Sequence, residues 1–302
     1  MPVRRIWIDC DPALGMLGRD ADDALALRQA WGTPGVEVGG ISASYGNARL
    51  RDTLRIAREV AGREARHRGR QDIQAVGGIV PGAEGAGRAC GDGVEACVRA
   101  LEAGPLVYLA LAPLTHLAAV LAARPDLAKQ IQDVVFVGGR TPGTRFFFGW
   151  CLYEFHDANV DKDPEAVRRV LEAPVPLTLV PIERAQEALL PQAGFREAVG
   201  GDAGGRWLEE RTRNWFRLWR WCTGLKGAPV FDSLAMLAAL EPEWVEFEER
   251  AARLEPFRGH PALHAVRGAG GRRVRFVSNM RAGAVEQMLV RMEREGDSGF
   301  KI

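Results

Sequence analysis

The feature that most constrains this chain is its first apolar run and the acids that follow it. Two aspartates, Asp9 and Asp11, come directly after an Ile-Trp-Ile run. Side chains two apart in a strand point to the same side, so we expect both carboxylates to project from one strand end. A turn containing Pro and Gly follows, and a second acidic group, Asp20, Asp22 and Asp23, opens a helix.

Carboxylates gathered in this way repel one another unless a cation or shared protons compensate. Oxygen ligands favour a hard ion such as Ca²⁺ or Mg²⁺. In a competing interpretation, the second acidic group only caps a helix and the first pair is solvated at a strand end. Because a buried strand that leads into successive acids carries an electrostatic cost, we favour a metal site for the whole cluster.

The composition is that of an ordinary soluble globular protein. The 302 residues are 47% hydrophobic, and 40 basic residues balance 39 acidic ones. This balance gives no support to binding of nucleic acid or of a membrane surface. The five cysteines form no CxxC pair, so we expect no disulfide framework. With no signal-like segment and no run of about 18 apolar residues, we expect a cytoplasmic protein.

Apolar strands alternate with helices along most of the chain. The continuous apolar run at 106–111 is typical of a strand covered on both faces, and residues 133–139 are expected to form the next buried strand. Further strands are expected at 6–10, 36–45, 73–76, 175–180, 245–254 and 273–277, a tryptophan-bearing helix at 207–222, and an exposed Arg-rich connection at 63–71. The alternation predicts an α/β fold in a single domain over 1–302: an open, mostly parallel central sheet with helices on both faces.

In such a sheet the ligand site forms at the carboxyl ends of the strands. Polar residues follow several of the expected strands, directly or in the next loop. They are Asp9, Asp11, Asn47, Thr115, Asp157, Asn159 and Asp232. We therefore expect residues far apart in sequence to converge on one crevice.

A series of short motifs occurs in a fixed order along the chain. The first is Asp9-Cys10-Asp11-Pro12, completed by Asp22-Asp23-Ala24, which matches a pattern D-x-D-P-x-x-D-D-A. The others are Gly46-Asn47, residues 112–118 (A-P-L-T-H-L-A), Val137-Gly138-Gly139, residues 157–166 (D-A-N-V-D-K-D-P-E-A) and residues 231–235 (F-D-S-L-A). This ordered set resembles the inosine–uridine-preferring nucleoside hydrolase family.

The resemblance implies Ca²⁺-dependent hydrolysis of the N-glycosidic bond of a ribonucleoside, giving ribose and free base. It implies that Asp11, Asp23, Asp232 and the main-chain carbonyl of Thr115 hold the ion, with Asp9 in support. Asp11 would be the general base that takes a proton from a water on the ion.

The resemblance also implies how the substrate is held. Asp22, Asn47, Asp157 and Asn159 would bind the ribose hydroxyls, while the carboxylates stabilise an oxocarbenium-like transition state. His156, beside Asp157, is a further candidate for contact with the substrate. The partner would be a small-molecule nucleoside, and the family suggests a homodimer or homotetramer.

The chain departs from the family pattern in four places. Seven extra residues, about 15–21, separate the two acidic groups, and we expect a loop over 14–19 near the mouth of the site. Phe231 stands where many members have a His that protonates the leaving base. Asp157 replaces a Glu, and Cys90 stands where a His is common. The residues that would assist departure of the base therefore differ from those of the family, which leaves the preferred nucleoside open.

Aromatic residues are the candidates for contact with the base, since stacking suits a planar group. They lie in a loop at 146–155 and at Trp215, Trp219 and Trp221. The competing interpretation places them in the core or at an interface. Four histidines, His116, His156, His260 and His264, are candidate proton donors, each with a structural role as the alternative.

Two other functions stay open. Phosphatases that resemble haloacid dehalogenase also begin with a strand and D-x-D, use the first Asp as nucleophile and bind Mg²⁺. Here Pro12-Ala13 stands where they have Thr or Ser, and the acid expected after Gly91-Asp92-Gly93 is missing. The other function is binding of Ca²⁺ and ribose without turnover on a nucleoside-hydrolase scaffold. A modified or nicotinamide-type nucleoside, whose base needs less acid help, is the alternative substrate.

Overall fold

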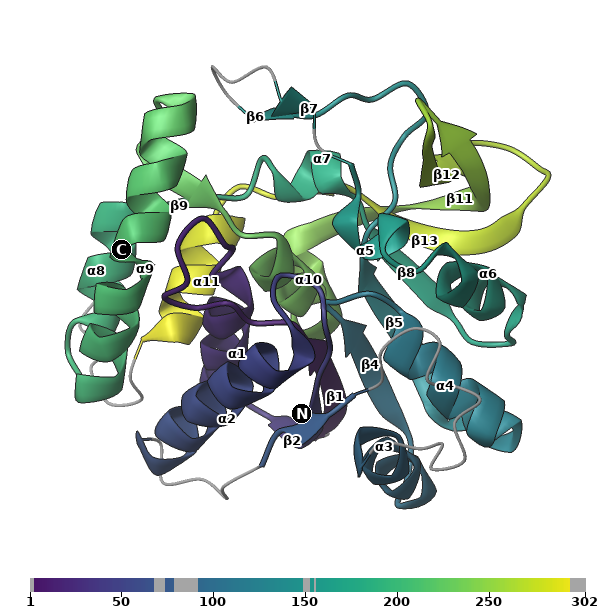
Figure 1. The fold of residues 1–302 in the computed structure, drawn as a ribbon, viewed down its shortest axis with the longest axis horizontal. Helices are drawn as coiled ribbons and strands as arrows, with labels where there is room; N and C mark the ends of the chain where they lie inside the picture. The colour runs from purple at the N-terminus through teal and green to yellow at the C-terminus, as the bar shows by residue number, and fades with distance from the viewer. Residues whose placement is uncertain (1–2, 68–73, 79–91, 149–152, 155, 294–302) are drawn as a thin grey trace.

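The computed structural model describes residues 3–67, 74–78, 92–148, 153–154 and 156–293. Its main feature is a nine-stranded sheet (Figure 1). The strands are β1 (Arg4–Cys10), β2 (Val36–Ala43), β3 (Val76–Gly77), β4 (Leu106–Ala110), β5 (Ile131–Val137), β8 (Leu177–Val180), β11 (Val245–Phe257), β12 (His260–Val266) and β13 (Arg272–Met280). They are ordered β12-β11-β13-β8-β5-β4-β1-β2-β3. Short strands β6 (Phe147–Phe148) and β7 (Tyr153–Glu154) pair with each other, as do β9 (Leu189–Pro191) and β10 (Gly227–Pro229).

The pairing confirms the predicted mostly parallel sheet. All neighbours from β3 to β13 are parallel, whereas β11 pairs antiparallel with both β13 and β12. The sequence pattern predicted only two strands in this C-terminal part and missed β12. The parallel strands end at the same edge of the sheet, which is where we expected the site.

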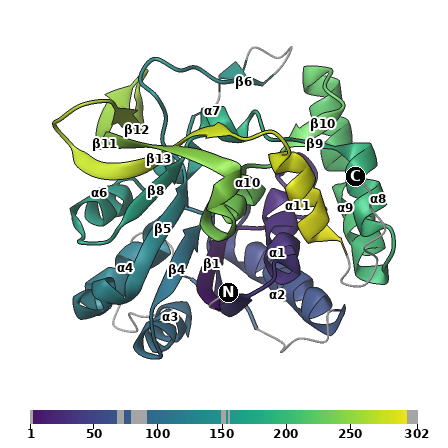
Figure 2. The ribbon, with the colours of Figure 1, turned by 180° about the vertical axis from the view of Figure 1, so that it is seen from behind.

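Helices cover both faces of the sheet (Figure 2). They are α1 (Asp22–Gly32), α2 (Leu50–His67), α3 (Asp92–Glu102), α4 (Thr115–Ala123), α5 (Ala158–Asp161), α6 (Pro164–Glu172), α7 (Ile182–Ala185), α8 (Gln192–Val199), α9 (Ala203–Thr223), α10 (Phe231–Leu240) and α11 (Ala284–Met292), with 3₁₀ turns at Pro125–Gln130 and Pro242–Trp244. Among the described residues, none of these helices is long and apolar enough to cross a membrane.

Strand β1 shows how the sheet separates two cores. Its alternate residues Ile6, Ile8 and Cys10 pack with α1, α2, α10 and α11 in one core, while Trp7 packs with α3, α4 and α6 in the other. A strand covered in this way must be apolar on both faces, which explains its unbroken apolar run. The first polar side chains after the run are therefore delivered to the edge of the sheet.

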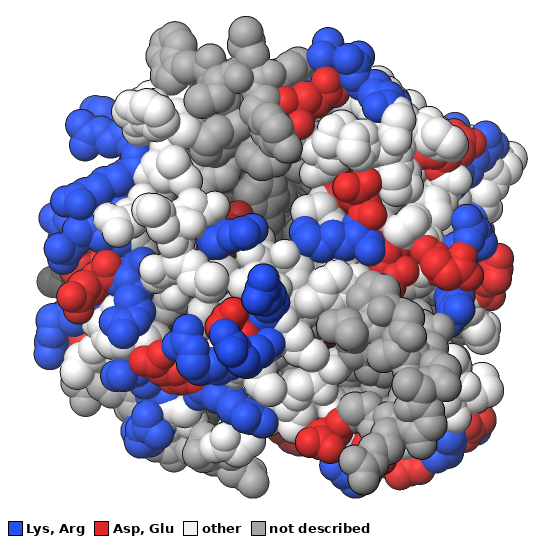
Figure 3. All heavy atoms as spheres, in the orientation of Figure 1, with Lys and Arg blue, Asp and Glu red and all other residues white. Residues whose placement is uncertain are grey.

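The tryptophan-bearing helix α9 lies with α8 beyond α1 and α11, away from the sheet (Figure 1). Its N-terminus is capped by Asp202, which accepts from the Gly205 N–H at 2.6 Å, and it ends at Gly224, whose φ of 72° favours glycine. Basic side chains gather on the surface over α2 and α9 (Figure 3), while Trp215 and Trp219 are buried. The helix thus presents an aromatic stripe to the interior.

The predicted exposed connection at 63–71 is wrong for residues 63–67, which continue α2. The reason is a buried ion pair of Glu64, which the abundance of Arg in this segment did not indicate. Arg28 of α1 contacts Glu64 at 2.9 Å, Asp202 at 2.5 Å and the Met292 carbonyl at 2.6 Å. Such a buried guanidinium needs several acceptors at once, and here they join α1 to α2, α9 and α11.

Candidate active site

A cavity of about 350 Å³ opens at the carboxyl ends of the strands. Its polar wall consists of acids and amides from distant parts of the chain: Asp11, Asp20, Asp22, Asn47, Asp157, Asn159, Gln186 and Asp232. Its apolar wall consists of Leu111, Val137, Ile182, Trp215, Leu218, Trp219 and Phe231. Residues from position 11 to position 232 therefore converge on one crevice, as the fold class led us to expect.

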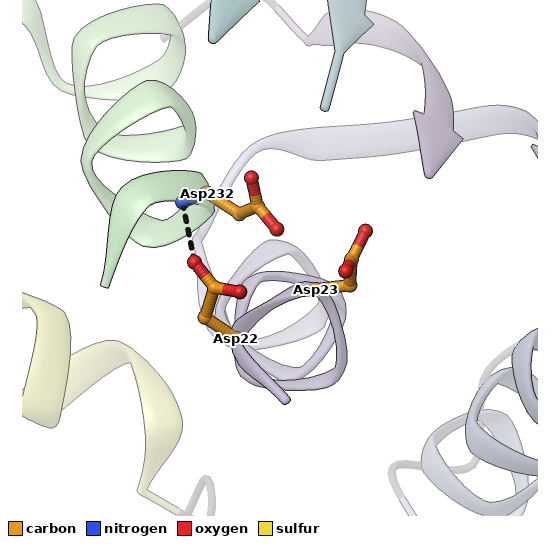
Figure 4. Close-up of side chains that lie close together, drawn as sticks. All are labelled: Asp22, Asp23 and Asp232. Atoms are coloured by element: carbon orange, nitrogen blue, oxygen red, sulfur yellow. Dashed lines mark hydrogen bonds between the residues drawn. The ribbon is translucent and has the colours of Figure 1, made fainter. Parts of the chain in front are cut away.

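Three carboxylates form an acidic cluster, two of which, Asp22 and Asp232, belong to the polar wall (Figure 4). Oxygen atoms of Asp22, Asp23 and Asp232 all lie within 4.8 Å of one another. The first two begin α1 and the third lies in the first turn of α10, so the positive ends of two helix dipoles meet here. The Asp232 N–H donates to Asp22 Oδ2 at 3.1 Å, which fixes the two helices relative to each other.

Asp11 lies next to this group and is held by a backbone loop. Its N–H donates to Asp23 Oδ1 at 2.9 Å. Its carboxylate accepts from the main-chain N–H of Asn47 at 2.8 Å and from the Asn47 side chain at 3.1 Å. A Cβ at Gly46 would lie 1.5 Å from Asp11 Oδ2, so only glycine permits this approach. The Gly46-Asn47 motif therefore orients Asp11.

The helix-capping interpretation does not account for Asp22 and Asp23, although Asp20 accepts from the Ala21 N–H at 2.9 Å just before the helix. The N-cap of α1 is Ala21, which makes no side-chain capping bond. Asp22 and Asp23 instead accept hydrogen bonds from the main chain of Asp232 and Asp11, residues outside the helix. The first turn of α1 is thus used to assemble the acidic cluster.

Burial makes this cluster electrostatically expensive. Burial, followed by repulsion from Asp23, raises the pKa of Asp11 well above its usual range. Burial also raises the pKa of Asp22 and of Asp232 well above the ordinary value, and repulsion between neighbouring aspartates adds to the effect. Burial raises the pKa of Asp23 to about 7. Oxygen ligands gathered under this mutual repulsion fit a hard divalent cation, so the cluster can hold a metal ion.

Asp157 and Asn159 line the cavity from the loop that leads into α5. Asp157 accepts from the Gly139 N–H at 2.7 Å and from the Val160 N–H at 3.2 Å, and burial raises the pKa of Asp157 to about 6. The Asn159 amide donates to the carbonyls of Val137 and Leu111, at 3.0 and 3.2 Å. Both side chains are therefore fixed by the main chain at the ends of β4 and β5.

Three predicted metal ligands, Asp9, Asp23 and Thr115, do not line the cavity, although Asp23 belongs to the acidic cluster beside it. Asp9 is fully buried and accepts from the hydroxyls of Ser42 and Ser44, each at 2.8 Å. The i, i+2 expectation does not hold because β1 ends at Cys10, so Asp11 lies beyond the regular strand. Thr115 already belongs to α4, and its hydroxyl donates to Asp163 at 2.6 Å. The main-chain segment after β4 that does line the cavity is Leu111.

The predicted aromatic contacts divide into two groups. Trp215 and Trp219 line the cavity, whereas Trp221 is 75% exposed on the other side of α9 and lies outside its wall. Phe146 is buried against the Arg140 guanidinium, 4.6 Å from its ring centre. Cys90, residues 149–152 and residue 155 lie outside the described residues.

The sequence reasoning missed several wall residues. Leu218 stands three positions after Trp215 and one before Trp219, so helical spacing was a signal for it. Ile182 and Gln186 follow β8, and its carboxyl end was also a signal. Gly18 and Arg19 come from the loop predicted near the mouth, and both line the cavity.

The four histidines have different surroundings. His156 lines the cavity and stacks on His260. His116 is fully buried, with its Nδ1 2.7 Å from the Tyr108 hydroxyl, and His264 is buried in β12. A structural role therefore fits His116 and His264, while His156 has access to a ligand.

An acidic cluster able to hold a metal ion, beside a polar and an aromatic wall, is the site of an enzyme that acts on a small molecule. Comparison with known proteins identifies the class. The chain matches the model of the inosine-uridine preferring nucleoside hydrolase family over residues 6–285. It belongs to this family, and it is an enzyme of the nucleoside N-glycosidic hydrolase class.

Relatives in sequence and in structure agree with this assignment. The chain is 24% identical to a pyrimidine-specific ribonucleoside hydrolase, RihA, from Photobacterium profundum, with 82% of this chain and 86% of the relative covered. A plant nucleoside hydrolase superposes with a TM-score of 0.78 at 18% identity, covering 96% of this chain and 99% of the other. A purine-preferring ribonucleoside hydrolase from Gardnerella vaginalis superposes with a TM-score of 0.78 at 18% identity, covering 96% and 98%. At these identities, the two structures establish the fold.

Proposed function

We propose that this protein hydrolyses the N-glycosidic bond of a ribonucleoside, giving ribose and free base, with Ca²⁺ as its metal ion. The observation that carries the proposal is the cluster of Asp22, Asp23 and Asp232, with oxygens within 4.8 Å of one another, beside a cavity of about 350 Å³ that Asp22 and Asp232 line. That volume lies within the range of small-ligand sites.

The ion would be held by Asp11, Asp23 and Asp232, with Asp22 beside them and the Leu111 carbonyl in place of that of Thr115. Seven to eight oxygen ligands are common for Ca²⁺, and carboxylates and main-chain carbonyls are typical donors. When bound, the ion would lower the pKa of water and order the ribose hydroxyls.

The chain's own residues supply the remaining chemistry. Asp11 acts as the general base that takes a proton from the attacking water, and the two bonds from Asn47 hold its carboxylate in place. Asn47, Asp157 and Asn159 bind the ribose hydroxyls. The surrounding carboxylates stabilise the positive charge that develops on the sugar as the bond to the base breaks.

The base would lie against the apolar wall, where Trp215, Leu218 and Trp219 offer an aromatic and aliphatic surface. The relatives do not specify the base, because one is named pyrimidine-specific and another purine-preferring. Gln186 in the same cavity offers an amide for hydrogen bonding to the edge of a base.

The test is an assay of the purified protein with Ca²⁺ on purine, pyrimidine and nicotinamide nucleosides, with free ribose as the readout. Release of ribose from at least one nucleoside supports the proposal. If no ribose is released but ribose or a nucleoside raises the melting temperature, the protein binds without turnover, a result that Phe231 in the cavity would favour.

The metal is tested separately by elemental analysis. We expect calcium in the purified protein and its loss in Asp232→Asn. Asp126→Asn, at an exposed acid outside the cavity, is the matched control and should keep the metal. A metal-free wild-type protein that does not bind added Ca²⁺ would contradict the calcium assignment.

A further inference from the structure

Hydrolysis of an N-glycoside leaves an electron pair on the departing base, which needs a proton at neutral pH. The apolar wall against which we place the base has no acid to give one. Phe231 is part of that wall and carries no proton of the required kind. The titratable side chains of the cavity wall are five aspartates, Arg19 and His156. Burial raises the pKa of these aspartates, but four of them, Asp11, Asp22, Asp157 and Asp232, already have roles at the metal ion, the attacking water or the ribose. Asp20 and His156 remain, and of these two types the imidazole is the one with an ordinary pKa near neutrality.

The His156 ring is held from behind. It stacks on His260 of β12 with ring centres 3.6 Å apart and planes 19° apart. His260 Nδ1 in turn lies 3.1 Å from an Asp161 carboxylate oxygen. The next residue, Asp157, is fixed by two main-chain N–H groups. His156 is therefore positioned on the cavity wall by the contact of its ring with His260 and by the fixed residue that follows it.

Carboxylates surround the stacked pair. Asp161 contacts His260, and Asp157 follows His156 in the chain. Hydrogen bonding from Arg145, with smaller contributions from Arg258 and His156, lowers the pKa of Glu154 in β7.

We propose that His156 is the general acid that protonates the departing base, and that His260, held by Asp161, positions its ring. This inference rests on the proposed function. The C1′–N bond breaks and its electron pair goes to the base, which takes the proton of the His156 imidazolium. Water forms the new C1′–O bond and loses a proton to Asp11. His156 regains a proton from solvent, and Asp11 releases one.

The experiment compares two kinds of leaving group in the calcium-loaded protein. One substrate is the nucleoside that the wild-type protein hydrolyses best. The other is 4-nitrophenyl ribofuranoside, whose departing phenolate is stable without protonation. For His156→Gln we expect kcat on the nucleoside to fall about 10²–10⁴-fold, the usual worth of general acid catalysis, with a far smaller change on the nitrophenyl riboside.

His264→Gln is the matched control, because His264 lies in β12 outside the cavity wall. It should not discriminate between the two substrates, and melting temperatures check that each variant is folded. An equal loss on both substrates, or no loss on the nucleoside, overturns the role of His156. If Asp20→Asn instead lowers kcat on the nucleoside alone, Asp20 is the proton donor, and the role of His156 is also overturned.

His260→Phe tests the positioning role, since it keeps a ring for stacking but removes the contact with Asp161. We expect kcat on the nucleoside to fall, less than in His156→Gln, while kcat on the nitrophenyl riboside changes far less. An equal change on both substrates, or no change on the nucleoside, contradicts the role of His260. Wild-type protein that hydrolyses neither substrate contradicts the proposed function itself, whereas wild-type activity with an unaffected His156→Gln contradicts this inference alone.

Discussion

The two halves of the cavity are built in different ways. In the acidic half, main-chain N–H groups hold the side chains: Asp11 to Asp23, Asp232 to Asp22, and Gly139 to Asp157. In the apolar half, three of the wall residues come from one face of α9, a helix that lies beyond the sheet. Substitutions in the acidic half would therefore disturb main-chain contacts at the edge of the sheet. Substitutions in the apolar half would affect side chains on one helix. Under the proposed function, this division would separate the residues that cleave the bond from those that contact the base.

The largest effect is expected at Asp11, in the acidic half. Asp11→Asn keeps the size of the side chain but removes the general base, so kcat should fall about 10²–10⁴-fold. The measurement is ribose release under saturating nucleoside, with circular dichroism to confirm the fold. Activity equal to that of the wild type would show that another group takes the proton.

Removal of calcium should affect both activity and stability. Chelation leaves the buried carboxylates without a compensating charge, so activity should be lost and the melting temperature should fall. At a calcium concentration about 100-fold above Kd, binding stabilises the fold by about 2.7 kcal/mol. In Asp232→Asn the chelator should change the melting temperature much less, and an equal shift in both proteins would place the ion elsewhere.

A smaller effect is expected in the apolar half. Trp219 lines the cavity and is 7% exposed, so Trp219→Ala should raise KM about fivefold through lost stacking, worth about 1 kcal/mol. Inhibition by free ribose should stay unchanged, because ribose contacts only the acidic half. Trp221→Ala, on the same helix but 75% exposed, is the control. If both variants behave alike, α9 does not contact the base.

The sequence predicted the acidic half well because its residues follow strand ends, where the sheet topology dictates convergence. It misplaced Asp9 because spacing alone does not show where a strand ends. Asp11 lies one residue beyond β1, and Oδ1 of Asp9 accepts from the hydroxyls of Ser42 and Ser44 away from the cavity. It misplaced Thr115 because a helix begins there and directs the threonine hydroxyl to Asp163.

The apolar half could be predicted only in part. Trp215 and Trp219 were candidates among many aromatic residues, and nothing local distinguishes them from Trp221 until the direction of α9 is known. That direction depends on tertiary contacts such as those of Arg28 with Glu64 and Asp202, which join segments 36 and 174 residues away. Contacts of this kind also explain why 63–67 is helical rather than an exposed connection.

The smallest effect concerns the free-energy cost of burying the ionised carboxylate of Asp157 in the acidic half. Burial raises the pKa of Asp157 from 3.8 to about 6, so the folded protein holds a proton that the unfolded chain releases. Its contribution to stability is therefore present below about pH 4 and is lost as the pH rises through about 6. The free energy of unfolding of Asp157→Asn should rise relative to that of the wild type over this window, by up to about 3 kcal/mol.

The measurement is chemical unfolding of metal-free protein at several pH values. Asp126→Asn provides a control of opposite sign, because hydrogen bonding from Arg124 lowers the pKa of Asp126. Its wild-type carboxylate stabilises the fold increasingly as the pH rises, so this variant should lose stability relative to the wild type. If Asp157→Asn follows the wild-type pH dependence, Asp157 ionises as freely in the fold as in the unfolded chain. The acidic half would then be less costly at this position than burial implies, and less dependent on a bound cation and sugar hydroxyls for its order.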